Sequence, residues 1–152
     1  MIASMLAFAL SVAAQTVAPQ TAAPQGAVPP VPGELGRQPL PAQGCAAYLW
    51  NVSDRKLVVM AGADPALVRL VLGGKAIDLA RESESGLGGF GFAGRTAYRN
   101  SDVTVTLDMT VQTQADLTDG GAVPQGTLTL ERGGADAVVI PVAGLIGCAP
   151  AR

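Results

Sequence analysis

The sequence predicts an all-β domain, a small antiparallel β-sandwich or β-barrel, that follows a signal peptide and a proline-rich linker. Two observations carry this prediction. Short apolar runs, alternating or β-branched, fill residues 45 to 148, and turn signals separate them at intervals of roughly 8 to 12 residues, which gives about seven to nine strands. The composition, with 19 glycines and 11 prolines, is typical of extended strands joined by turns.

Residues 1–14 (MIASMLAFALSVAA) form an uncharged apolar run that is shorter than the about 20 residues of a membrane-spanning helix. Val12 and Ala14 are small residues at the −3 and −1 positions of a signal-peptidase site. The run therefore predicts a secretory signal peptide cleaved before Gln15, although no Lys or Arg precedes it. An apolar N-terminus that stays attached is the alternative.

Residues 15–44 contain most of the chain's 11 prolines and few residues that could pack. Proline favours extended polyproline II geometry, so we expect a disordered, semi-rigid linker. Recognition by a proline-binding domain is the alternative.

The expected β-domain covers residues 45–152 and has one cysteine near each of its ends, Cys45 and Cys148. Exported proteins form disulfides from such pairs, so we predict a Cys45–Cys148 bond that joins the first strand to the last. Two free, buried cysteines are the alternative.

The first two strands are expected in CAAYLWNV, from Cys45, and in KLVVMAG, up to Gly62. Residues 65–73 have two interpretations. Asp64 and Pro65 could begin a helix, but LVL and KAIDL on either side of Gly73-Gly74 favour a β-hairpin.

The clearest strand is DVTVTLDMTVQ, in which Val103 and every second residue after it are apolar, so that one face is core and the other is solvated. A turn is expected from Asp116 to Pro124. GTLTLER and DAVVIPV then form a hairpin around Gly133-Gly134, and Pro141 should lie at an edge, at a bulge or on a side without a partner.

Charge and composition exclude several classes of function. The net charge is −2 and the 10 basic residues are scattered, so no surface for nucleic acid or anionic lipid is expected. The chain has no histidine, which excludes histidine-dependent catalysis and histidine metal sites. We expect a non-enzymatic protein without cofactor or metal, and no membrane span in the mature chain.

The candidate binding residues are Tyr48, Trp50, Phe90, Phe92 and Arg95. Exposed aromatic rings would form a platform for a glycan or an anchor for a partner protein, whereas buried rings would be core residues. The glycine-rich loop from Gly86 to Arg95 and the Asp116 to Gly121 turn are further candidate surfaces, because binding residues concentrate on loops held by a rigid scaffold.

Three weaker motifs have simpler explanations. Gly86, Gly88 and Gly91 match the GxGxxG spacing, but no helix is expected after them, so we interpret the segment as a kinked strand or loop. Glu82 and Glu84 could act as a carboxylate pair, but their polar neighbours favour a solvated strand end. For the turn around Asp116 and Asp119, an Asx-type turn is favoured over a calcium site.

In outline, a small disulfide-bonded β-domain behind a signal peptide is similar to periplasmic lysozyme inhibitors, and no residue is matched to their inhibitory motif. The sequence predicts a periplasmic or secreted, envelope-associated binding module whose partner is an envelope protein or a glycan. An inhibitor of a cell-wall-degrading enzyme such as lysozyme, and a carboxylate-dependent hydrolase, are the alternatives.

Overall fold

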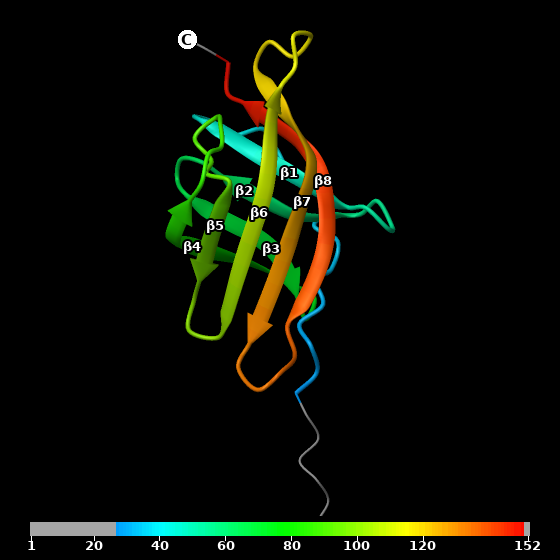
Figure 1. Ribbon diagram of the computed structural model, residues 1–152. Coiled ribbons are helices and arrows are strands. Elements are labelled where there is room, and N and C mark those ends of the chain that lie inside the picture. Colours follow the sequence, from blue (N-terminus) through cyan, green and yellow to red (C-terminus); the bar gives the residue numbers. More distant parts are fainter. Residues whose placement is uncertain (1–26, 151–152) are drawn as a thin grey trace, which may run out of the picture.

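The computed structural model describes residues 27–150, in which eight antiparallel strands form a closed barrel (Figure 1). Each strand pairs with its neighbours in sequence, and β8 pairs with β1. The prediction of an all-β antiparallel fold is confirmed. Of the two predicted architectures, sandwich and barrel, the protein forms the barrel. The strands are β1 (Cys45–Asn51), β2 (Leu57–Gly62), β3 (Leu67–Leu72), β4 (Lys75–Ser85), β5 (Arg95–Arg99), β6 (Val103–Thr113), β7 (Gly120–Arg132) and β8 (Val138–Cys148).

Because the strands alternate in direction, their connections fall at two ends of the barrel. The connections 63–66, 86–94 and 114–119 lie at one end together with the start of β1 and the end of β8. We call this the loop end; it lies along the top and upper left of Figure 1. The other connections lie at the opposite end.

The barrel interior is filled by apolar side chains. Inward positions of all eight strands contribute to one buried apolar cluster, as expected for a barrel of this strand number. The predicted alternation in β6 is confirmed, because Val103 and the apolar residues at every second position up to Met109 are buried. The largest fully buried side chains include Tyr98, Leu49, Leu70, Leu79, Leu107, Leu128 and Leu130.

The predicted disulfide is present and lies across the closing seam of the barrel. Cys45 and Cys148 face each other in the β1–β8 ladder, with their Cα atoms 3.9 Å apart. The bond indicates that the protein folds in an oxidising, non-cytoplasmic compartment. No helix within residues 27–150 is long and apolar enough to cross a membrane.

The structure decides between the two interpretations of residues 65–73. β3 and β4 form a hairpin, and Gly73 and Gly74 have φ values of 56° and 77°, which the two central residues of a type I′ turn require. The hairpin prediction is confirmed and no helix forms there.

The expected turn from Asp116 to Pro124 is shorter than predicted, because β7 begins at Gly120 and Pro124 lies within it. The β7–β8 register shifts between Val123 and Gly126, so Pro124 occupies a bulge, where a missing N–H costs no ladder bond. Pro141 lies one position beyond the β1–β8 ladder, which ends at the Asn51–Val142 pair; on that side its carbonyl accepts a 3.1 Å bond from Val52 N–H in the connection after β1, and its lack of an N–H breaks no pair of the ladder.

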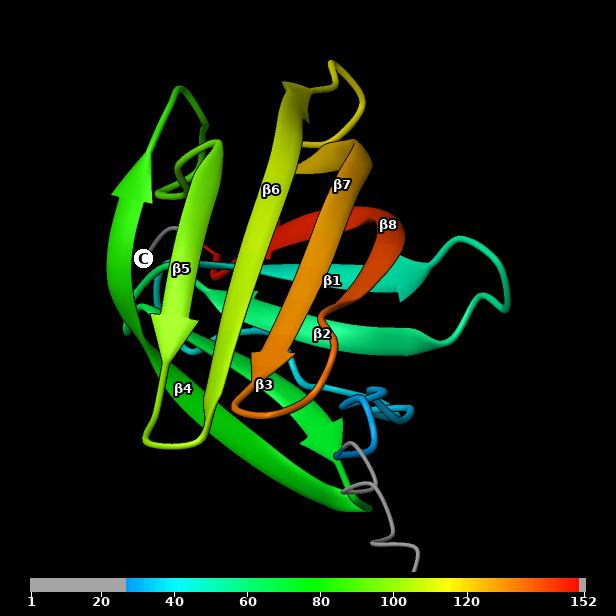
Figure 2. The same ribbon diagram turned by 60° about the horizontal axis from the view of Figure 1, so that its bottom comes forward.

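The second half of the expected linker packs on the barrel. The predicted signal peptide and residues 15–26 lie outside the described residues, but residues 33–44, which we call the strap, cross the outer surface of β3, β2 and β1 (Figure 2). Gly33 N–H donates to Val71 O and Leu35 N–H donates to Leu57 O, each at 2.8 Å. The strap covers an outer apolar cluster, described below, that would otherwise face water.

Candidate functional site

The five candidate binding residues are divided among three places. Tyr48 and Trp50 lie on the outer face of β1 under the strap, Phe90 and Phe92 lie in the 86–94 connection, and Arg95 begins β5. Arg95 forms an ion pair with Asp108 of β6 at 2.9 Å. The structure therefore does not bring the five side chains together into one surface.

Tyr48 is a packing residue of the strap, not part of an exposed platform. Its ring is only 9% exposed and clusters with Ala46 and Leu57, with Trp50 packed against the group. Its hydroxyl donates a 2.6 Å hydrogen bond to Pro39 O, which ties the strap to β1. Burial raises the pKa of the Tyr48 phenol. With this ring covered, β1 lacks the exposed aromatic pair that a glycan platform would need.

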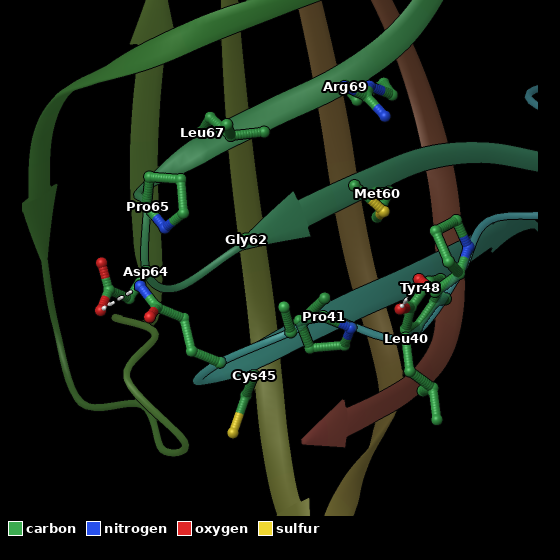
Figure 3. Close-up of a pocket in the computed structure, with 14 residues that line it drawn as sticks. Leu40, Pro41, Cys45, Tyr48, Met60, Gly62, Asp64, Pro65, Leu67 and Arg69 are labelled. Carbon is green, nitrogen blue, oxygen red and sulfur yellow. Dashed lines mark hydrogen bonds between the residues drawn. The ribbon is translucent and has the colours of Figure 1, made fainter. Parts of the chain in front are cut away.

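A groove of about 510 Å³ lies between the strap and β3, with β2 as its floor (Figure 3). Leu40 and Pro41 form one wall, Leu67 forms the other, and Met60 lies on the floor. Polar groups sit at its margins and already have partners: Arg69 pairs with Asp78 through two bonds of 2.7 Å, and Gln43 donates to Asp64 at 3.5 Å. The groove is an apolar surface with few free polar groups.

The glycine-rich loop 86–94 is tightly folded and anchored to the barrel by its two phenylalanines. Phe92 is 7% exposed and belongs to the interior cluster, and Phe90 packs against that cluster. Phe92 N–H donates to Gly89 O at 3.0 Å. Phe90 and Gly91 both have positive φ values, 59° and 85°, as in a type I′ turn.

A bulky residue with positive φ is strained, so the backbone conformation of Phe90 needs stabilising contacts elsewhere. The Phe90 ring makes such a contact, because it lies so close to Gly121 that a side chain on Gly121 would overlap the ring. Gly88 is equally constrained, since a Cβ there would overlap Phe92 O. The loop is thus held in one shape by aromatic anchors below and by close backbone contacts within it.

Leu87 is the side chain that this loop presents to solvent. It is 99% exposed, the highest value among the exposed large apolar residues of the described chain. Its backbone packs on Gly94, where a Cβ would come within 2.7 Å of Leu87 O. Leu87 is not among the candidate residues predicted from the sequence, because Phe90 and Phe92 of the same segment are also large apolar residues flanked by glycine.

The GxGxxG glycines belong to this loop. They follow β4 and precede β5, so no helix follows them, as the sequence predicted. A dinucleotide site of that type requires the N-terminus of a helix at this position, so the glycines serve the fold of the loop instead.

The two connections beside the loop carry negative charge. Ala63 contacts the loop, since a Cβ on Gly91 would lie 3.0 Å from Ala63 Cβ, and Asp64 follows in the same connection. On the other side, the 114–119 connection carries Asp116 and Asp119 and leads to the Gly121 contact with Phe90. None of these three aspartates is in an ion pair within the described residues.

Glu82 and Glu84 are each engaged by a different arginine. Arg81 donates to Glu84 at 2.6 Å, and Arg99 donates to Glu82 at 3.4 Å. Both carboxylates are at the surface, where a bulge between Arg81 and Ser83 interrupts the β4–β5 register. A glycosidase pair needs one carboxylic acid that protonates the leaving group from within a cleft. This arrangement lacks such an acid.

The comparisons with known proteins give no relative: no family model, curated protein or solved structure matches the chain.

Proposed function

We propose that this protein is a non-enzymatic binding module of the bacterial envelope, periplasmic or secreted, and that it binds a partner protein through the loop end. The observation that carries the proposal is Leu87, a fully exposed apolar side chain on a loop that Phe90 and Phe92 fix to a packed barrel. Isolated exposed apolar residues are common, but one on a preformed loop loses little conformational entropy when it is buried by a partner.

The same geometry favours a protein over a glycan as the partner. Glycan platforms use exposed aromatic rings, and among the candidate rings Tyr48 and Phe92 are buried and Phe90 packs against the core. A leucine side chain has no group that hydrogen-bonds a sugar, whereas it fills an apolar pocket of a protein well. The inhibitor alternative is one form of this proposal, in which the bound partner is a wall-degrading enzyme.

Affinity capture from the host envelope extract tests the proposal. The oxidised protein is compared with Leu87→Ser and with the matched control Val139→Ser, which alters an apolar residue that is 62% exposed on the outer face of β8. We expect one protein to be recovered in near-stoichiometric amount by the wild type and by Val139→Ser, and to be lost with Leu87→Ser.

Neither substitution should change the thermal midpoint by more than about 4 °C, because exposed side chains contribute little to stability. Recovery of a glycan alone, or of the same protein by all three baits, would contradict the proposal. If the captured protein is a wall-degrading enzyme, inhibition is assayed by measuring its activity on its substrate with and without the module.

A further inference from the structure

The proposal developed here rests on the proposed function and concerns the chemistry of the partner. The structure carries two independent features at the loop end: exposed leucines and an uncompensated negative charge. Leu87 is 99% exposed and Leu117, in the neighbouring 114–119 connection, is 36% exposed. An interface with an apolar centre and a charged rim has this composition.

The charge at the loop end is one-sided in the described residues. The basic residues nearest this end, Arg81 and Arg95, are in ion pairs with Glu84 and Asp108, so these pairs contribute no net charge. Asp64, Asp116 and Asp119 have no such partner, which leaves a formal charge of −3.

The opposite end has a different balance. The basic residues outside ion pairs there are Arg37, Arg55, Lys56, Lys75 and Arg132, and the acidic ones are Glu34, Asp54, Asp102, Glu131 and Asp136, five of each. Their formal charges cancel. The negative field is therefore a property of the loop end and not of the whole barrel.

We infer that the partner is a basic protein with an apolar pocket that receives Leu87, and that cationic side chains around the pocket face Asp64, Asp116 and Asp119. Rim charges of this kind act mainly on the association rate and on its salt dependence, whereas a buried apolar anchor acts mainly on the dissociation rate. The two features can therefore be separated by kinetics.

The test begins with the host envelope extract divided on a cation exchanger at pH 7 into a retained, basic fraction and an unretained fraction. Each fraction is offered to the full oxidised protein and to the same bait carrying Leu87→Ser. We expect a Leu87-dependent partner in the basic fraction only. A Leu87-dependent partner in the unretained fraction would overturn this inference while the proposed function stands. If no Leu87-dependent partner is found in either fraction, both fail.

The purified partner is then used for kinetics with two matched double variants. Asp116→Asn with Asp119→Asn removes two charges at the loop end, and Asp102→Asn with Asp136→Asn removes the same charge at the opposite end. For the first we expect the association rate at low salt to fall about 3- to 10-fold with a flatter salt dependence. We expect no change for the second. Leu87→Ala should instead raise the dissociation rate about 10-fold or more. Equal effects of the two double variants would overturn the inference.

Discussion

Removal of the Cys45–Cys148 disulfide should destabilise the barrel by an amount that follows from the position of the bond. The two cysteines are 103 residues apart, so the bond restricts almost the whole domain in the unfolded state. The loop-closure relation gives an entropy change of about 16 cal/mol/K, or about 4.7 kcal/mol at 25 °C, as the upper value. We expect Cys45→Ala with Cys148→Ala to lower the free energy of unfolding by about 2 to 5 kcal/mol.

Urea unfolding, followed by the fluorescence of Trp50, the single tryptophan, measures this change. The m-value should rise as well, because an unfolded chain without the bond is more expanded and exposes more surface. Wild-type protein reduced with dithiothreitol keeps both sulfur atoms and controls for lost packing. A loss below about 1 kcal/mol with an unchanged m-value would refute the reasoning, since the β1–β8 ladder alone would then hold the seam.

Two further predictions concern the tyrosines. Tyr48→Phe removes the hydrogen bond to Pro39 O and should lower the free energy of unfolding by about 1 kcal/mol. The same urea titration measures this change. An unchanged free energy of unfolding would show that the strap does not depend on this bond. Burial raises the pKa of both Tyr98 and Tyr48 above 10.0, and it is the largest cause of the shift for Tyr98. Because the folded-state pKa is the higher one, the stability contributed by the neutral phenols is complete below pH 10 and is lost as the pH rises through the folded-state pKa. Absorbance at 295 nm should therefore show tyrosinate forming at higher pH in folded than in urea-unfolded protein, and coincident titration curves would contradict this.

Much of the fold could be predicted because local signals and tertiary structure agree. The alternation from Val103 to Val111 defines a strand with one buried face, and Gly73-Gly74 defines a hairpin turn whatever surrounds it. The choice between barrel and sandwich could not be made in the same way. It depends on whether β8 pairs with β1, a contact between the two ends of the domain that no local pattern records.

The strap shows why a proline-rich composition was insufficient to predict disorder. Proline limits the hydrogen bonds a segment can make, but it also reduces the conformational entropy lost on docking. Here a few backbone bonds and the burial of the outer cluster around Tyr48 are enough to place the segment on the barrel. The sequence showed the apolar residues of β1 but not that both faces of that strand are covered.

The sequence predicts the loop from Gly86 to Arg95 as a candidate surface, with its aromatic residues as the binding groups. Phe90 and Phe92 instead support the loop, and the exposed group is Leu87. Composition alone could not distinguish an anchor that faces inward from one that faces outward, because both are large apolar residues flanked by glycine.

The two ends of the described chain leave the barrel in opposite directions. Ala27 pairs with Ala135 in the β7–β8 connection, at the end opposite the loop end, whereas Ala149 N–H donates to Gly44 O beside the loop end (Figure 1). A biosensor surface coupled upstream of residue 27 would therefore leave the loop end facing the solution, and one coupled after Pro150 would hold it against the matrix. A larger binding signal from the first surface than from the second would indicate that the partner binds at the loop end.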